Sequence, residues 1–172
     1  MLLNQSAKAN FKLLPLTGSA TDAIPLVAAL RRGEMVAMMG DRAYGSPVAD
    51  VPFFDGEAAF PVGAHVMAAI AGSPLVTVFS LREPGGHYHF FGFPPQRPDH
   101  PPHHLRNQHL RECAAIFARR LEGIVKRDPL QWYNFFPFWN PPQDTSAGAP
   151  PSSTALHPTP VLAPTSSTAS SN

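Results

Sequence analysis

The alternation of apolar and polar positions along the chain predicts a series of short strands and helices. Residues 11–16 form a short apolar run, which predicts a strand even though Pro15 cannot donate a ladder hydrogen bond. Residues 21–32 have helical periodicity with two Arg in the last turn, and Gly33 supplies the stop. The apolar run at 35–39 predicts a buried strand. The order strand, helix, strand predicts a βαβ unit with a parallel pair.

A segment without a regular period, residues 40–63, separates that strand from the next predicted helix. It contains several Gly, three Phe and an Asp-Arg pair. We expect an irregular loop that carries polar groups of a site while rigid elements hold it in place. The following helix is predicted at 61–71, and Gly72 is its C′ residue.

The second half of the chain predicts a hairpin, one long helix and an aromatic segment. Residues 75–81 and 87–93 read as strands on either side of turn residues, which predicts a hairpin with a longer loop. Residues 105–126 predict the longest helix, because apolar residues recur at three- and four-residue spacing. These residues are Leu110, Cys113, Phe117, Leu121 and Ile124. Residues 130–139 then hold six aromatic side chains in ten positions.

Composition sets limits on the class of protein. A chain of 172 residues with 44% hydrophobic content favours one domain with a real core, which we place at residues 1–139. Residues 140–172 are rich in Pro, Ser, Thr and Ala and predict a disordered tail. The net charge of +1 gives no bulk attraction to nucleic acid. No run approaches the roughly 18–20 apolar residues that a membrane span needs.

The eight His residues raise the alternative of a soluble metal-binding protein. His87 and His89 alternate on one predicted strand, and four more lie in or beside the Pro-rich stretch at 94–104. Structural zinc sites want four ligands at tight spacing, commonly with thiolates. Here Cys113 is the single cysteine and no HExxH motif occurs. We therefore expect solvated or packing histidines and no metal site.

An acid and a base, Asp41 and Arg42, follow the predicted buried strand at 35–39. A guanidinium at the carboxyl end of a strand is placed to bind a phosphate or carboxylate, and the neighbouring Asp could orient it. The alternative is a surface acid and base that happen to be adjacent. Phe53 and Phe54 likewise allow two interpretations, a hydrophobic plug over the sheet end or a wall for an apolar ligand.

The aromatic residues between Trp132 and Trp139 also have two interpretations. They either close the core or anchor the protein at a membrane interface, where amphipathic rings are favoured. Basic residues just upstream, beside exposed aromatics, would suit an anionic membrane surface. These basic residues are Arg119, Arg120, Lys126 and Arg127.

Three motifs occur in order between residues 33 and 139: GEMVAMMGDR, then VPFFDGEAAFPVGAHVMAAIAGSPLVTVF, then DPLQWYNFFPFW. Each motif resembles a characteristic segment of one protein family. The first resembles its strand that ends in Asp followed by Gln or Arg, and the second resembles its Phe-Phe-x-Gly turn followed by a helix and a strand. The third resembles a closing Pro-x-Gln-Trp segment. In this order they resemble the bacterial lipid A biosynthesis acyltransferases, the late acyltransferases of the lysophospholipid acyltransferase superfamily.

The resemblance implies an α/β fold with a mixed, mostly parallel sheet flanked by helices, as in glycerol-phosphate acyltransferases, incomplete here at its amino terminus. It implies an O-acyltransferase without a cofactor. Such an enzyme moves a fatty acyl chain from acyl carrier protein or coenzyme A to a hydroxyl of a lipid or glycolipid acceptor. It also implies a peripheral location on the cytoplasmic face of the bacterial inner membrane, against an anionic surface.

The family's catalytic dyad, a His followed five positions later by Asp or Glu, is absent from this sequence, because none of its His residues has an acid at that position. The chain resembles the carboxyl-terminal part of such an enzyme, and we expect it to be inactive alone. A non-catalytic lipid- or anion-binding module of the same fold is the alternative. By resemblance, the acyl-acceptor side of the site falls to Asp41, Arg42, Phe53, Phe54, Gly56, Phe60, Pro61 and Gly63.

Overall fold

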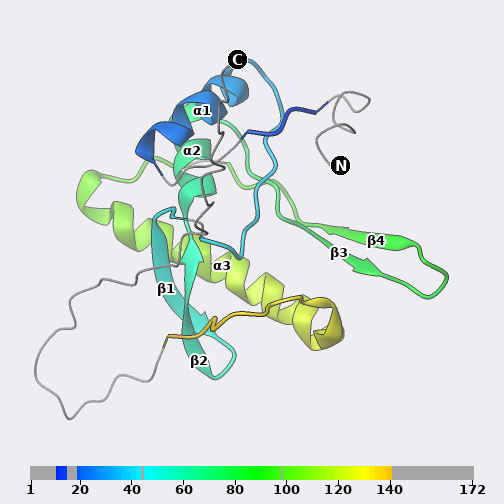
Figure 1. The fold of residues 1–172 in the computed structure, drawn as a ribbon. Helices are drawn as coiled ribbons and strands as arrows, with labels where there is room; N and C mark the ends of the chain where they lie inside the picture. The colour runs from blue at the N-terminus through cyan, green and yellow to red at the C-terminus, as the bar shows by residue number, and fades with distance from the viewer. Residues whose placement is uncertain (1–10, 15–18, 44, 98, 141–172) are drawn as a thin grey trace, which may run out of the picture. The chain divides into compact units, whose positions relative to one another are not determined.

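The computed structural model describes residues 11–14, 19–43, 45–97 and 99–140, all within one compact unit, Met1–Pro141. Of the predicted tail, only Asn140 lies among the described residues. The elements follow in the order shown in Figure 1. They are η2 (Ala20–Asp22), α1 (Ala23–Arg31), β1 (Val48–Phe53), β2 (Gly56–Pro61), α2 (Gly63–Ala71), β3 (Val78–Arg82), β4 (Tyr88–Gly92), η3 (His103–Leu105), α3 (Arg106–Arg127) and η4 (Pro129–Gln131).

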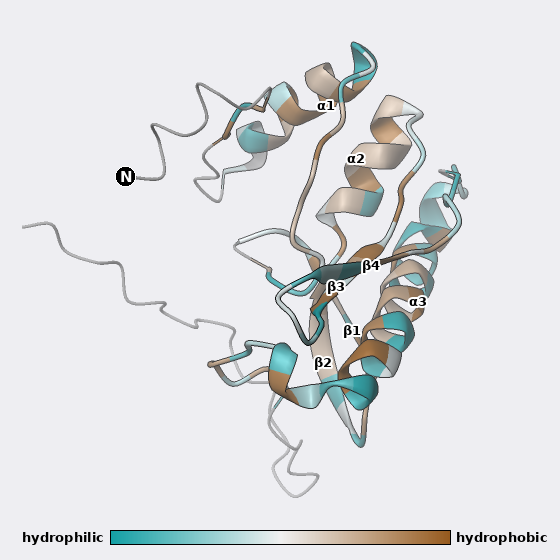
Figure 2. Cartoon of the chain, turned by 90° about the vertical axis from the view of Figure 1, so that its right-hand side faces the viewer, coloured by the Kyte–Doolittle hydropathy of each residue, from teal (hydrophilic) through white to brown (hydrophobic). Residues whose placement is uncertain are grey.

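The core lies between helix α3 and the antiparallel hairpin β1–β2, which pack against each other (Figure 1). The hairpin contributes side chains that alternate along each strand, as expected of a sheet with one buried face. These are Val51, Phe53, Ala58 and Phe60, all fully buried. The helix contributes a narrow stripe of small and branched residues, Ala114, Ala118, Leu121 and Val125. Figure 2 shows α3 alternating between hydrophilic and hydrophobic residues, as a helix with one buried face should.

Helices α1 and α2 pack together at the other end of the unit, where each buries two residues. Arg31 Nη2 also donates a hydrogen bond across this contact to the Ile70 carbonyl at 3.2 Å. Both helices end as predicted, with Gly33 and Gly72 at φ 81° and 69°. Such left-handed backbone is the ordinary end of a helix and favours glycine.

The second hairpin, β3–β4, is confirmed and extends past the side of α3 (Figure 1). Its turn runs through Gly85 and Gly86, both with positive φ. Leu81 on β3 and Thr77, just before that strand, are buried. The opposite face exposes apolar side chains, including Val78 and Phe90 at 53% and 67%. Within the described residues, no helix is both long and apolar enough to cross a membrane.

Two predictions about the first third of the chain are wrong. Residues 11–14, the described part of the strand predicted at 11–16, are not a strand, and residues 15–16 lie outside the described residues. Residues 35–39 are not a strand either, and Met35 is 96% exposed. An apolar run becomes a strand only when a neighbour takes up its backbone hydrogen bonds, and no described strand pairs with either segment. The βαβ unit is therefore absent from the described residues. Their strands pair antiparallel, so the mixed helix and strand content is confirmed and the mostly parallel sheet is not.

The segment at 40–63 is also different from the irregular loop that the sequence predicts. It holds the whole β1–β2 hairpin and the start of α2, with Phe53 opposite Gly56 across a two-residue turn. Phe54, the first turn residue, has φ 52°, which is uncommon for a bulky side chain. Because β2 runs through Pro61, helix α2 begins at Gly63 and not at residue 61.

Candidate functional site

The segment that follows α3, residues 132–139, connects most of the residues that the sequence singles out. The Trp132 ring lies 5.5 Å from Phe53 and 5.0 Å from Phe138, centroid to centroid. Phe138 is 8% exposed and packs edge-on against Phe60 at 5.3 Å. For Trp132 and Phe138, the interpretation that the aromatic segment closes the core is therefore confirmed.

Gly56 provides the space that the last aromatic ring of this segment needs. Trp139 Nε1 donates a hydrogen bond to the Phe53 carbonyl at 3.0 Å, and Trp139 also forms an antiparallel bridge with Ala58. A Cβ at position 56 would lie 2.8 Å from Trp139 Cδ1, closer than real Cβ contacts. The glycine of the Phe-Phe-x-Gly turn thus allows the close approach of the indole to the hairpin.

Asp41 and Arg42 bind the opposite end of the same segment. Asp41 Oδ2 accepts a hydrogen bond from Trp132 Nε1 at 3.1 Å, and Arg42 Nη2 donates to the Tyr133 carbonyl at 2.9 Å. The Arg42 guanidinium carbon also lies 5.9 Å from the centre of the Phe136 ring. Two stretches that lie 91 residues apart in the sequence therefore meet at one place.

In this arrangement the hydrogen-bonding capacity of the Arg42 guanidinium is not fully used. Its Nε atom is buried and has no hydrogen-bond partner among the described residues. The ion pairs of the described part also leave Arg42 without a carboxylate partner. Buried donors without a partner are rare and call for an explanation. The Arg42 guanidinium is held at Nη2 and has further N–H donors, so it could donate hydrogen bonds to an anion.

The other predicted site residues do not gather around a cavity. Phe53 and Phe60 are 0% exposed and belong to the core, and for Phe53 this favours the hydrophobic plug over a wall for an apolar ligand. Phe54 is partly exposed, and Lys126 Nζ lies 5.5 Å from the centre of its ring. Pro61 and Gly63 lie at the far end of the hairpin from Gly56, and a Cβ at position 63 would lie 3.4 Å from Ser46 Cβ.

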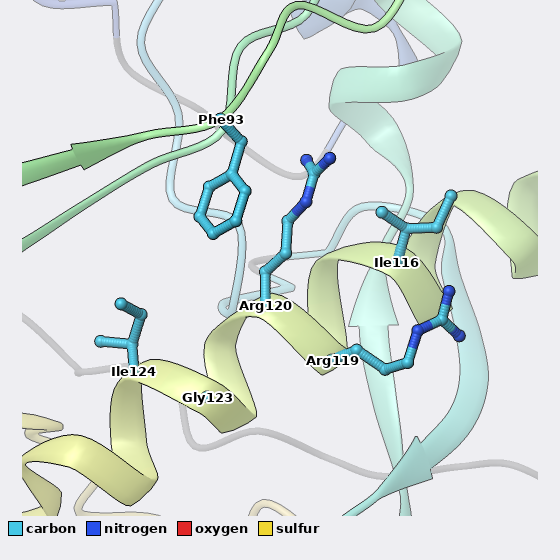
Figure 3. A pocket seen from close by; sticks show the side chains of 6 residues that line it. All are labelled: Phe93, Ile116, Arg119, Arg120, Gly123 and Ile124. Carbon is cyan, nitrogen blue, oxygen red and sulfur yellow. The ribbon is translucent and has the colours of Figure 1, made fainter.

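None of the eight predicted residues lines either of two open grooves in the described structure. The first has a volume of about 410 Å³ on the surface of α3 and is lined by Phe93, Ile116, Arg119, Arg120, Gly123 and Ile124 (Figure 3). Arg120 stacks 4.5 Å over the Phe93 ring and donates to Thr77 Oγ1 at 3.1 Å. The second, of about 520 Å³, lies between the start of β1 and the start of α3. The consecutive Arg119 and Arg120 were the available sequence signal for the first groove.

The histidines do not form a metal site in the described part, where no three His, Cys, Asp or Glu side chains gather as ligands would. His65 on α2 is partly buried, and burial lowers its pKa, assisted by the positive charges of His109 and Arg120. Burial likewise raises the pKa of the Cys113 thiol, whose Sγ lies 3.6 Å from His109 Nε2. A thiol kept protonated is a poor nucleophile and a poor metal ligand.

Comparison with known proteins gives the family. The sequence profile described as bacterial lipid A biosynthesis acyltransferase matches residues 2–140. The chain belongs to this family. A search of curated proteins and a search of solved structures gave no match. Family membership assigns the chain to the acyltransferases of lipid A biosynthesis, which act with an acyl donor and a lipid acceptor in general.

Proposed function

We propose that this chain forms the acceptor-binding part of an acyltransferase. The enzyme would move a fatty acyl chain from a thioester, on acyl carrier protein or coenzyme A, to a hydroxyl of a lipid or glycolipid acceptor. We place it peripherally on the cytoplasmic face of the bacterial inner membrane. Because the sequence contains no His followed five positions later by an acid, it lacks the family's general base, and the chain alone transfers no acyl group.

The environment of Arg42 carries this proposal. Its Nη2 is held by the Tyr133 carbonyl, its Nε is buried and unpaired, and it has no ion pair within the described residues. A phosphate or carboxylate of the acceptor would take two parallel charge-assisted hydrogen bonds from such a guanidinium. Because the Tyr133 carbonyl already holds the Arg42 side chain, less of its conformational freedom is lost on binding.

Asp41 and Phe136 support the same role. The Asp41 carboxylate is engaged by Trp132 Nε1, so it fixes the position of the chain beside Arg42. The ring of Phe136 lies 5.9 Å from the Arg42 guanidinium and limits its contact with water. Lower local polarity strengthens an ionic hydrogen bond. These residues would therefore position the acceptor. Acyl transfer itself would also need the general base that this sequence lacks.

A non-catalytic anion- or lipid-binding module is the second candidate function. It is favoured because Arg42 has no ion pair within the described residues while the catalytic dyad is missing from the sequence. It predicts that the chain binds the anion of the acceptor without any acyl transfer. Joining the chain to a family segment that carries the His and the acid separates the two. Acyl transfer to a lipid A precursor by the joined protein supports the enzyme part, and binding without transfer supports the module.

The direct test is a titration of the full chain with glucosamine 1-phosphate, followed by tryptophan fluorescence, to which Trp132 beside the Asp41–Arg42 cluster and Trp139 both contribute. Loss of one bidentate charged contact, about 1.5–3 kcal/mol, should weaken binding at least about tenfold in Arg42→Ala. Arg42→Lys should recover only part of it, because an ammonium keeps the charge but lacks the fork. Arg119→Ala, an exposed arginine elsewhere, is the matched control and should bind normally. Equal affinity of wild type and Arg42→Ala would show that Arg42 is not the anion site.

A further inference from the structure

The backbone between Trp132 and Phe138 presents large side chains to solvent. We call residues 133–136 the aromatic loop; in it, Tyr133, Phe135 and Phe136 are 61%, 89% and 46% exposed. Leu130, just before the loop, is 87% exposed. The Tyr133 and Phe135 rings lie 6.4 Å apart, whereas the Phe136 ring lies 5.9 Å from the buried Phe138. Tyr133 and Phe135 thus contribute little to the core.

The aromatic loop is fixed at both of its ends. Before it, the Gln131 side-chain amide accepts from Arg82 N at 2.6 Å and donates to the Arg82 carbonyl at 2.8 Å. At its first residue, the Tyr133 carbonyl accepts from Arg42. After it, Phe138 is buried and Trp139 Nε1 donates to the hairpin. Rings carried by a fixed backbone lose little conformational entropy when they contact a partner.

Arg42, which contacts the aromatic loop, has no carboxylate partner among the ion pairs of the described residues, and neither have Arg82 and Arg127. Arg42 contacts Phe136, Arg127 ends α3 and stacks 4.8 Å over Phe91, and the backbone of Arg82 pairs with Gln131. Several acids beside these arginines in the sequence have other partners, and Glu83, next to Arg82, contacts His89. Asp41 and Asp128 accept hydrogen bonds from Trp132 and Gln131, and Glu122 pairs with Lys126.

From this arrangement we propose that the aromatic loop inserts into the interfacial zone of an anionic lipid bilayer. Tyr133, Phe135 and Leu130 would enter between the headgroups, and the unpaired arginines would face lipid phosphates. Exposed aromatic rings beside cations suit an interfacial anchor. A stable protein interface needs about 1,000 Å² or more with a polar rim, and a four-residue loop with one leucine is too small for that.

The inference rests on the proposed function in one respect: insertion of this loop brings Arg42 to the depth at which a lipid acceptor presents its headgroup. The bilayer contact itself needs neither acyl transfer nor acceptor binding. A vesicle assay therefore tests it independently of the titration of Arg42.

The experiment is flotation of the full chain with vesicles of phosphatidylcholine alone or with phosphatidylglycerol. Wild type should float with the anionic vesicles and less so as salt is raised, because exposed charges are screened. The double variant Tyr133→Ser/Phe135→Ser should bind at least about tenfold more weakly, which corresponds to about 1.4 kcal/mol. The matched control is Ile24→Ser/Phe90→Ser, whose side chains are 66% and 67% exposed, and it should bind as wild type does.

All four side chains lie mostly in solvent, so each variant should keep the melting temperature of the wild type. An unchanged melting temperature shows that the variant is folded. Failure of the wild type to bind anionic vesicles would overturn the proposal. Equal losses of vesicle binding in the double variant and its control would also overturn it. Self-association that disappears only in the double variant, without vesicle binding, would mark the loop as a protein contact and overturn it as well. A normal Arg42 titration beside a failed flotation would leave the proposed acceptor binding standing, although not the proposed contact with the membrane.

Discussion

Trp132 Nε1 donates a hydrogen bond to Asp41 Oδ2 at 3.1 Å, and this bond joins two motifs that lie 91 residues apart in the chain. One motif precedes the β1–β2 hairpin, and the other follows α3. The same two motifs meet again in the hydrogen bond from Arg42 to the Tyr133 carbonyl. The Asp-Arg pair and the closing Gln-Trp segment are therefore one structural unit.

The bond between Asp41 and Trp132 should be measurable by a double-mutant cycle. Asp41→Ala and Trp132→Phe should each lower the free energy of unfolding, and the double variant should lose less than the sum. A partly buried hydrogen bond to a charged group gives a coupling of about 1–2 kcal/mol. Urea unfolding measures it, with Glu34→Ala in place of Asp41→Ala as the control. Glu34 pairs with Arg32 at the surface, so additive losses are expected there.

Gly56→Ala should destabilise the protein, because the new Cβ would lie 2.8 Å from Trp139 Cδ1 while that indole is held by the Phe53 carbonyl. Overpacking of this kind costs about 1–3 kcal/mol. Gly123→Ala is the opposite case, since its Cβ would have no neighbour within 4 Å on α3. That change should stabilise by about 0.5–1 kcal/mol through helix propensity. Thermal unfolding of both variants checks the pair, and two shifts of the same sign would contradict this account.

Gln131→Ala should loosen the attachment of the closing segment to β3. It removes both hydrogen bonds that the side-chain amide makes with the Arg82 backbone. At about 0.5–1.5 kcal/mol for each bond, a loss of about 1–2 kcal/mol in unfolding free energy is expected. Gln108→Ala, which removes an exposed bond to Glu112 on the same helix face, should change stability by less than about 0.5 kcal/mol. Similar losses in both would show that the Arg82 contacts contribute little.

Stability should fall on the acid side of neutrality because of His65. Its pKa is lowered by burial, with the charges of His109 and Arg120 adding to the effect. Between the unfolded pKa of about 6.5 and the lower folded value, the unfolded chain binds more protons, so unfolding is favoured as pH decreases. His65→Gln should therefore flatten the pH dependence of the unfolding free energy below that point. The exposed His87→Gln is the control, and an unchanged slope in His65→Gln would assign the loss to other groups.

Elements whose signals are local could be predicted well from the sequence. Helix α3 spans Arg106–Arg127 against the predicted 105–126, and the β3–β4 hairpin matches its two predicted strands except that β3 extends one residue further, to Arg82. Gly33 and Gly72 end α1 and α2 with positive φ as expected. Helical periodicity, end residues and turn chemistry act within a few positions, so the chain itself carries enough information to set them.

The buried face of α3 shows where local pattern is no longer sufficient. Of the apolar stripe predicted for the helix, Leu121 is buried, whereas Ile124 lines an open groove. The stripe that faces the hairpin is completed by Ala114, Ala118 and Val125. Small side chains are buried there because the rings of Phe53 and Phe60 fill the space from the other side. Packing density, and not hydrophobicity alone, selects which side of the helix is covered.

By itself, the sequence determined the helices, the second hairpin and the family, together with the choice of Asp41 and Arg42 as a polar pair. Only the tertiary structure decided that 35–39 is exposed and unpaired, that 48–61 pairs as a hairpin, and that Phe53 and Phe60 are core residues. It also decided that Arg42 is held by Tyr133 with its Nε unpaired. Strand pairing, burial and hydrogen-bond partners depend on residues many positions away, and a local pattern carries no information about which distant segment will supply them.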